Sequence, residues 1–163
     1  MGFDSETAFE SALIKCLVEE KGWKDGVIKY PTEKDLLDNW AKIIFENNRD
    51  IDRLGDFPMT DGEMAQIMGQ IAKLRTPLNL NGFINGGTVQ IIRDNENDTH
   101  NFKKTISLKI FDRNEIAAGR TRYQIAQQPK FKAKNSIYPN RRGDFCLLIN
   151  GMPVIHVELK TVS

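Results

Sequence analysis

A chain of 163 residues with 40% hydrophobic and 28% charged residues is large enough for one core and too apolar to be disordered. Its net charge of +1 indicates no particular class of partner, and its two cysteines, Cys16 and Cys146, exclude a disulfide framework. No apolar run approaches the roughly 20 residues needed to cross a membrane, and the first residues lack a signal-peptide pattern, so we expect no membrane association and a cytoplasmic location.

Three amphipathic helices are predicted in the first half of the chain. The first runs from Ser5 to Lys21, because apolar residues recur there at three- and four-residue steps, and Gly22 follows as its end. The second is predicted from Thr32 to about Asn47. The third runs from Thr60 to Leu74 and begins with the pattern of a capping box.

The second half of the chain has strand character. Residues 79–87 are predicted to form a loop because Asn and Gly dominate them, and the polar residues 94–101 a loop within a hairpin. Helices first and strands later indicate α+β order along the chain, or an α/β fold with one sheet flanked by helices, in a single domain over residues 1–163. The predicted strands are Thr88–Ile92, Thr105–Phe111, Arg122–Ala126, Phe145–Ile149 and Val154–Leu159.

Charge is distributed unevenly along the chain. Residues 1–70 hold 15 acids and 8 bases, a balance of −7, whereas residues 116–143 hold seven bases and no acid. A polyanion would be attracted to the second stretch, and the alternative is a solvated basic face. The bases that we consider as candidate contacts to such a polyanion are Lys130, Lys132, Lys134, Arg141 and Arg142.

A hairpin is predicted near the C-terminal end, because Asn150-Gly151 lies between two apolar runs. By alternation, Glu158 and Lys160 share one face of the returning strand. A short turn returns Glu158 to within about one position of Asp144, on the same side of the hairpin. The opposite faces are wholly apolar and are expected to face a core; they consist of Phe145, Leu147 and Ile149 and of Ile155, Val157 and Leu159.

Two carboxylates and a lysine at one end of a hairpin suit metal chemistry. A hard divalent cation such as Mg²⁺ relieves the repulsion between two nearby carboxylates, lowers the pKa of a bound water and stabilises charge on a phosphate. Lys160 can orient the attacking water or offset charge in the transition state. The alternative is an ion pair at the sheet edge between Lys160 and Glu158 or Asp144. Charges that alternate with core residues are costly to bury, which favours a functional site.

These residues carry a resemblance to a known nuclease group. Asp144 followed, after the hairpin, by Glu158-Leu159-Lys160 resembles the D…ExK signature of the PD-(D/E)XK nuclease superfamily, with Gly143 where the superfamily name has Pro. The whole run from Arg141 to Lys160 is similar to the N-terminal nuclease domain of the restriction (R) subunit of type I restriction–modification enzymes. The resemblance implies a restriction-endonuclease-like core, a mixed sheet flanked by helices.

The resemblance also implies an activity: that of a type I site-specific deoxyribonuclease, which hydrolyses phosphodiester bonds of double-stranded DNA. Asp144, Glu158 and Lys160 would be catalytic, and the two carboxylates would hold Mg²⁺, for which Mn²⁺ can substitute. Related nucleases often add a glutamate from the first helix, here Glu10 with Glu6 as the alternate, unless either is only an exposed helix carboxylate. The basic residues named above would contact DNA phosphates.

Further expectations concern the longer protein. The resembled family works with modification and specificity subunits and continues with a Gln-x-x-x-Tyr helix and an ATP-driven motor. This chain stops at Ser163 and lacks a GxxxxGK[ST] loop, so we expect a truncated fragment that binds no ATP and cleaves weakly or not at all. The alternative is a catalytically silent module of the same fold that binds DNA or docks subunits. His156 could be a second base or a ligand, although a structural role is the simpler expectation.

Overall fold

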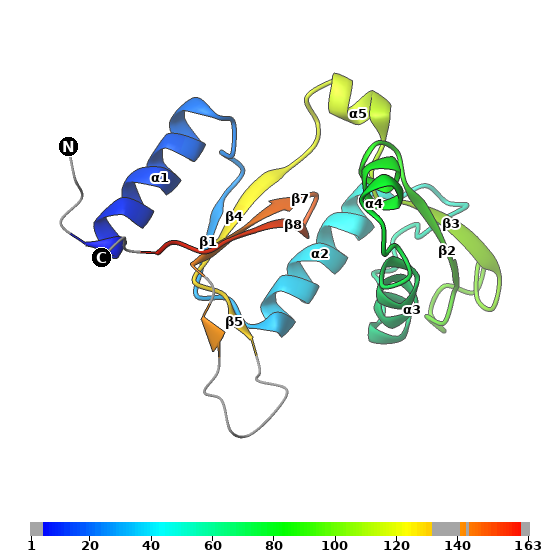
Figure 1. The fold of residues 1–163 in the computed structure, drawn as a ribbon. Helices are drawn as coiled ribbons and strands as arrows, with labels where there is room; N and C mark the ends of the chain where they lie inside the picture. Colours follow the sequence, from blue (N-terminus) through cyan, green and yellow to red (C-terminus); the bar gives the residue numbers. More distant parts are fainter. Residues whose placement is uncertain (1–4, 132–140, 143, 161–163) are drawn as a thin grey trace. The chain divides into compact units, whose positions relative to one another are not determined.

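The computed structural model describes residues 5–131, 141, 142 and 144–160 of the chain (Figure 1). The chain divides into two compact units, unit 1 with Met1–Leu36 and Arg122–Ser163, and unit 2 with Leu37–Thr121. Helices and a mixed sheet confirm the predicted α/β class. No helix among the described residues is long and apolar enough to span a membrane. The single nuclease domain expected over residues 1–163 stays a prediction.

Unit 1 is built on a mixed four-stranded sheet in the order β1-β4-β7-β8. β1 (Val27–Lys29) runs parallel to β4 (Tyr123–Gln127), which is antiparallel to β7 (Phe145–Ile149), and β7 is antiparallel to β8 (Met152–Val157). β1 was not predicted, because a strand of three residues contains too little alternation to be recognised in a sequence. The other three strands confirm predictions to within a few residues at their ends.

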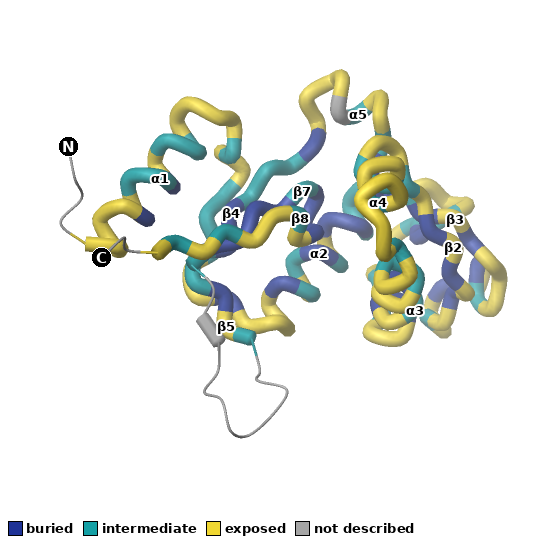
Figure 2. Tube along the Cα trace, in the orientation of Figure 1, coloured by how far each residue is buried: buried dark blue, intermediate teal, exposed yellow. Residues whose placement is uncertain are grey.

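Helices cover both faces of this sheet. α1 (Glu6–Glu20) packs on one face through a buried cluster of Ile14, Ile125, Phe145 and Leu147. The start of α2 (Glu33–Asn47) packs on the other face through a cluster of Leu36, Ala126, Cys146 and Leu148. In Figure 2 the middle of the sheet is accordingly dark blue, and α1 and α2 each show a mixture of buried and exposed positions.

This packing corrects one expectation about the hairpin. Cys146 and Leu148, on one face of β7, are buried in the cluster on the α2 face. Conversely Ile155, expected to face a core, is 51% exposed. Alternation gives two faces for each strand, but only the helices that cover the sheet decide which of them is buried.

The first helix begins and ends as its sequence predicts. The Ser5 hydroxyl oxygen accepts a hydrogen bond from the backbone N–H of Ala8 at 3.1 Å, which caps the start. At the other end Gly22 adopts a left-handed backbone with φ of +81°, and the N–H of Trp23 donates back to the carbonyl of Leu17 at 3.1 Å. This closing turn is one that glycine adopts with the least strain.

Unit 2 contains the antiparallel hairpin of β2 (Thr88–Ile92) and β3 (Thr105–Lys109), with α3 (Asp61–Ile71) beside β2. Amide side chains occupy positions along both edges of the hairpin. On β2, Gln66 accepts the N–H of Ile92 at 2.8 Å and donates to its carbonyl at 3.0 Å. On β3, Asn48 exchanges the same two bonds with Lys109, each at 2.8 Å. These amides replace part of the hydrogen bonding that a further strand would provide.

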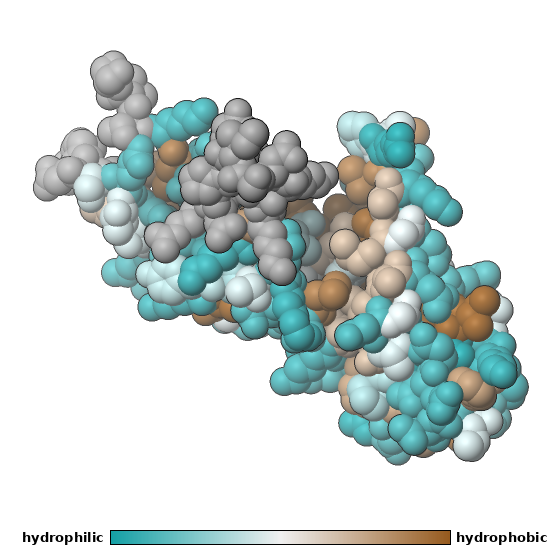
Figure 3. Space-filling model, turned by 90° about the horizontal axis from the view of Figure 1, so that it is seen from below, coloured by the Kyte–Doolittle hydropathy of each residue, from teal (hydrophilic) through white to brown (hydrophobic). Residues whose placement is uncertain are grey.

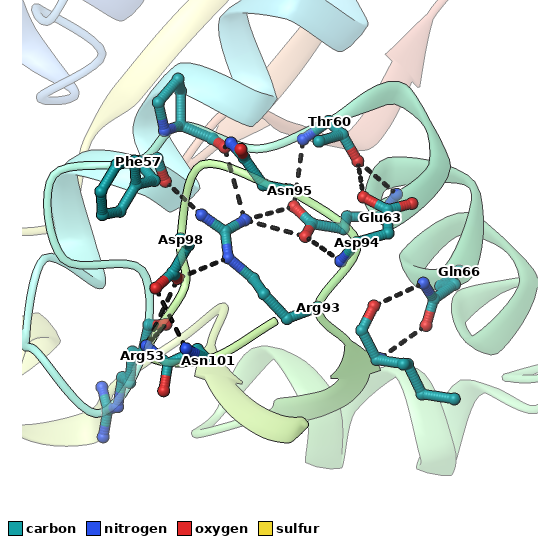
Figure 4. Close-up of polar contacts among 12 residues, drawn as sticks. Arg53, Phe57, Thr60, Glu63, Gln66, Arg93, Asp94, Asn95, Asp98 and Asn101 are labelled. Carbon is teal, nitrogen blue, oxygen red and sulfur yellow. Dashed lines mark hydrogen bonds and ion pairs between the residues drawn. The ribbon is translucent and has the colours of Figure 1, made fainter. Parts of the chain in front are cut away.

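A buried ion network fastens the loops of unit 2 to α3 (Figure 4). The fully buried Arg93 donates through Nη1 to both carboxylate oxygens of Glu63 at 2.6 and 2.8 Å, and through Nε to Asp98 at 2.9 Å. Its Nη2 donates to the carbonyl of Phe57 at 2.6 Å. Glu63 also completes the predicted capping box with Thr60. The charge of Arg93 is thus compensated in a place where an unpaired charge would be costly.

Two helices of unit 2 differ from the predictions. Residues 79–87 were predicted to be a loop, but α4 (Pro77–Ile84) occupies most of them, and α5 (Arg113–Ala117) is also new. α4 begins with Thr76, whose side chain accepts the N–H of Asn79 at 3.2 Å, and with a proline at its first turn. Phe83 packs edge-on against Phe111, with ring centroids 5.5 Å apart. The cap and this contact outweigh the poor helix propensity of Asn and Gly.

Large apolar side chains also remain on the surface. On the face seen in Figure 3, hydrophobic groups lie among hydrophilic ones. In unit 2 the most exposed are Leu78, at 79%, and Ile51, at 72%. Apolar residues scattered singly over a surface are normal in soluble proteins, so they identify no binding site by themselves.

Candidate functional site

The predicted hairpin turn is present at Asn150 and Gly151. Both residues have positive φ, 49° and 84°, as a two-residue turn of this kind requires, and Ile149 pairs with Met152 across it. Asn150 is buried; its N–H donates to the carbonyl of Arg122 at 2.8 Å, and its side-chain oxygen accepts the N–H of Arg122 at 2.9 Å. These contacts attach the turn to the residue that precedes β4.

A β-bulge interrupts the returning strand close to the turn. Leu148 pairs with Pro153, but Leu147 pairs with Ile155, so Val154 is an extra residue without a partner of its own on β7. A bulge of this kind shifts all pairing beyond it by one residue.

The bulge decides which residue faces Asp144. In an unbroken two-residue hairpin, Phe145 would pair with His156, Asp144 would lie opposite Val157, and Glu158 would point to the other face. Instead Phe145 pairs with Val157, and this register, continued by one residue beyond the strands, would set Asp144 opposite Glu158. The expected juxtaposition of the two acids therefore depends on a bulge that the sequence pattern did not reveal.

Asp144 is held by hydrogen bonds from two segments. Its carboxylate accepts the backbone N–H of Leu159, and its carbonyl accepts the N–H of Gln128 at 2.8 Å. The residue is half-buried at the start of β7. Its position is thus tied both to the end of β4 and to the segment that contains Glu158.

Glu158 and Lys160 lie at the surface just beyond β8. Their side chains are 67% and 79% exposed, and Lys160 Nζ is 4.0 Å from Glu158 Oε2. The alternative ion pair weighed from the sequence is therefore present, but exposed pairs of this kind contribute less than about 1 kcal/mol to stability. His156 is exposed opposite the buried Cys146, whose thiol pKa is raised by burial.

Glu10 differs from an ordinary helix glutamate because it is only 5% exposed. The Gln127 amide donates to its Oε1 at 2.8 Å, and the Gln128 amide lies 3.4 Å from Oε1 and 3.2 Å from Oε2. Sequence reasoning assigned these two glutamines no role. The local signal in the sequence was a pair of polar residues at the end of an apolar strand.

The donor set at the hairpin suits the chemistry of the expected metal. Asp144 and Glu158 supply carboxylate oxygens, and Mg²⁺ binds through one or two carboxylates while it keeps several waters. Among the described residues, however, no group of three or more His, Cys, Asp or Glu side chains lies close enough to hold a metal. The structure thus does not gather Glu10 with the other two acids, and the pair at the hairpin fits Mg²⁺ by its donor chemistry.

The basic stretch is described only in part. Lys130 is exposed in β5 (Lys130–Phe131), which pairs with β6 (Arg141–Arg142), and the register sets Lys130 opposite Arg142. Lys132 and Lys134 lie outside the described residues. Three of the five candidate phosphate contacts therefore belong to one short ladder in unit 1.

Comparison with known proteins gives the family. Residues 4–163 match the family model described as the type I restriction enzyme R protein N terminus. The chain is 28% identical over 164 residues to the endonuclease subunit of type I restriction enzyme SsaAORF53P of Staphylococcus saprophyticus, and 28% identical over 162 residues to that of SauCOLORF180P of Staphylococcus aureus. Each match covers 98% of this chain, which spans 15% of the length of the relative. The chain therefore belongs to the family of type I restriction enzyme R protein N termini.

Proposed function

We propose that this chain is a Mg²⁺-dependent endonuclease domain that hydrolyses phosphodiester bonds of double-stranded DNA in a type I restriction–modification system. The observation that carries the proposal is the bulged register, which ends at the pair Phe145–Val157 and, continued by one residue, would set Asp144 opposite Glu158, with Lys160 two residues further on. The family supports the same reading, because relatives that match nearly all of the chain are named as endonuclease subunits. The proposed site belongs to the PD-(D/E)XK type.

Each side chain has a proposed part in the reaction. Asp144 and Glu158 would hold the metal, which, when bound, supplies a water of lowered pKa and stabilises charge on the phosphate. The carboxylate of Asp144 is oriented by the N–H of Leu159 and keeps lone pairs for a further contact. Lys160 has three N–H donors and an exposed ammonium group, so it would orient the attacking water or offset charge in the transition state.

The DNA contacts and partners belong to the same proposal. Lys130, Lys132, Lys134, Arg141 and Arg142 would contact phosphates, which position DNA without reading its sequence. Recognition of a DNA site would come from specificity and modification subunits. ATP would serve the longer protein rather than this part of it.

A second candidate is a catalytically silent module that binds DNA or docks subunits. It is favoured by the surface ion pair between Glu158 and Lys160 and by the lack of a three-acid group among the described residues. In such a module, these charges would stabilise the sheet edge and would bind no metal.

Metal binding separates the two candidates. We expect calorimetry to detect one Mn²⁺ site in the chain and Glu158→Ala to weaken it by at least about tenfold. The matched control is Glu19→Ala, because Glu19 is 60% exposed and also lies 4.0 Å from a lysine, Lys15. No Mn²⁺ binding, or equal binding by both variants, would support the silent module.

Cleavage tests the role of the lysine. In a plasmid-nicking assay with Mn²⁺, we expect Lys160→Ala to reduce the rate by about 100-fold or more, the usual effect of removing one group that stabilises transition-state charge. Lys15→Ala removes a lysine of similar exposure on α1 and should leave the rate unchanged. Because the chain is short compared with its relatives, the rate is to be measured with excess protein over long times.

A further inference from the structure

We infer that Glu10 and Gln128 form a clamp that positions Asp144, so that Glu10 acts through hydrogen bonds rather than as a metal ligand. This inference rests on the proposed function for its importance to metal binding. Its structural part, which concerns the clamp and the Asp144 carboxylate, can be tested without a metal. The clamp is defined as the side chains of Glu10 and Gln128 together with the Gln127 amide.

The clamp connects four segments of unit 1 through successive contacts. Glu10, on α1, accepts hydrogen bonds from the amides of Gln127 and Gln128 at the end of β4. The backbone N–H of Gln128 donates to the carbonyl of Asp144 at 2.8 Å. The carboxylate of Asp144 then accepts the N–H of Leu159, next to Glu158. A displacement of the Gln128 backbone is therefore transmitted directly to the proposed site.

The backbone of Gln128 indicates that its side chain matters. Its φ is +48°, a left-handed conformation that glycine adopts easily and that other residues rarely adopt. This turn also ends strand alternation, because the side chains of Gln127 and Gln128 reach the same carboxylate instead of opposite faces. The presence of glutamine at a position that suits glycine is explained when its amide has a function, here the contact with Glu10.

The surroundings of Glu10 explain why it acts as an acceptor. The residue is buried, and both of its carboxylate oxygens accept hydrogen bonds from amides. A buried carboxylate without such donors would be costly, so the amides and Glu10 stabilise each other. Since no three-acid group exists among the described residues, Glu10 and the hairpin acids do not form one metal cage.

Hydrogen exchange at the Leu159 amide tests the structural part. This N–H reports the Asp144 contact directly, and NMR measures its exchange in the metal-free chain. We expect Gln128→Gly to accelerate exchange about fivefold, the effect of losing one ordinary hydrogen bond. The same variant relieves the left-handed backbone, which offsets the loss of one amide donor to Glu10, so the melting temperature should change little. Loss of ordering at the site without loss of stability is a result that a merely structural glutamine would not give.

Lys103→Gly is the matched control. Lys103 is also a non-glycine residue with positive φ, +61°, but it lies in the loop between β2 and β3 of unit 2. Its backbone N–H, which donates to the carbonyl of Arg93, is retained in glycine. We expect it to relieve backbone strain in the same way while leaving exchange at Leu159 unchanged.

Swapping the carboxylate and the amide between positions 10 and 128 tests whether the contact between Glu10 and Gln128 is responsible. Gln128→Glu should accelerate Leu159 exchange, because it sets two carboxylates against each other. Combining it with Glu10→Gln restores an amide–carboxylate pair in the reversed direction, and should return exchange toward the wild-type rate. Failure of the double variant to recover, with its fold intact by circular dichroism, would overturn the clamp, as would unchanged exchange in Gln128→Gly.

Mn²⁺ affinity then distinguishes failure of the clamp from failure of the proposed function. If the wild-type chain binds Mn²⁺, Gln128→Gly should weaken binding by about tenfold to 100-fold, as loss of an outer positioning contact does. The double variant Glu10→Gln with Gln128→Glu should bind Mn²⁺ with nearly the wild-type affinity. Wild-type binding that Glu10→Gln abolishes and Gln128→Gly leaves intact would make Glu10 a ligand and overturn the inference. A wild-type chain that binds no Mn²⁺ contradicts the proposed function. Hydrogen exchange at the Leu159 amide then tests by itself whether the clamp positions Asp144.

Discussion

Phe145 pairs with Val157 rather than with His156, and this shift of one residue, continued to the next position, would set Asp144 opposite Glu158. The extra residue that produces the shift is Val154, two positions before His156. The proposed nuclease site at the open end of the hairpin would therefore depend on strand register as much as on the identity of its acids. Register is a property that single-residue deletions test directly.

The first prediction compares two deletions in β8. Deleting Val154 removes the bulge but keeps every pair beyond it, so Mn²⁺ affinity should be retained. Deleting His156 leaves the bulge and moves Glu158 opposite Phe145, which turns its side chain to the other face, so affinity should fall by at least about tenfold. Calorimetry on both variants, with circular dichroism to verify folding, makes the comparison. Equal effects of the two deletions would show that register does not control the site.

The second prediction concerns the buried ion network of unit 2. Arg93→Met leaves Glu63 and Asp98 buried without a cation, so the free energy of unfolding should fall by about 3–5 kcal/mol. Arg49→Met removes an exposed pair with Asp56 and should cost less than about 1 kcal/mol. Urea unfolding measures both. A similar small loss in the two variants would mean that the network contributes nothing beyond a surface pair.

The third prediction gives the sign of a pH dependence. Burial by itself would raise the pKa of Asp98, but hydrogen bonds from Arg93 and Asn101 outweigh it and hold the pKa below its ordinary value. A carboxyl with a lowered folded-state pKa stabilises the fold above its unfolded pKa of about 3.9, and this contribution is lost as pH falls through the folded-state value.

Asp98→Asn should therefore reduce the loss of melting temperature when pH is lowered from about 5 to about 2. Asp52→Asn replaces an exposed aspartate in the same unit and serves as the control. Melting curves at a series of pH values provide the slopes. A slope in Asp98→Asn as steep as that of the wild type would contradict this account of the network.

The fourth prediction uses two glycines of α3. Nothing lies within 4 Å of a Cβ added at Gly69, so Gly69→Ala should stabilise the chain by about 0.5–1 kcal/mol. A Cβ at Gly62 would overlap the Asp94 carboxylate, which accepts a hydrogen bond from the Thr60 hydroxyl. Gly62→Ala should therefore lose that bond, about 1 kcal/mol, and gain no net stability. Thermal unfolding that ranks the two variants in the opposite order would refute the contact.

The fifth prediction concerns DNA affinity. Replacing Lys130, Lys132 and Lys134 by glutamine should weaken binding to duplexes of any sequence. It should also reduce the slope of log affinity against log salt by about 0.9 for each phosphate that the protein no longer neutralises. Neutralising the exposed Lys15, Lys21 and Lys24 in the acidic first part of the chain is the control. An unchanged slope in the first variant would show that the basic stretch is a solvated face that does not contact DNA.

Local chemistry in the sequence was enough to predict some features. The Asn150-Gly151 turn follows from the tolerance of these residues for positive φ, and the ends of α1 follow from Ser5 and Gly22. The α/β class and the membership of Asp144, Glu158 and Lys160 in one hairpin end were likewise available from pattern and resemblance. These features depend on neighbours in the chain, which a sequence displays directly.

The tertiary structure alone decided the features that depend on distant residues. The bulge at Val154, the burial of Glu10 against β4 and the pairing of Arg93 with Glu63 have no local signal, because each reflects which segments pack together. Helix α4 formed against its Asn and Gly content because Thr76 caps it and Phe83 contacts Phe111. Composition sets the helix or strand propensity of each segment. When that propensity is weak, the free energy of packing decides which secondary structure the segment adopts.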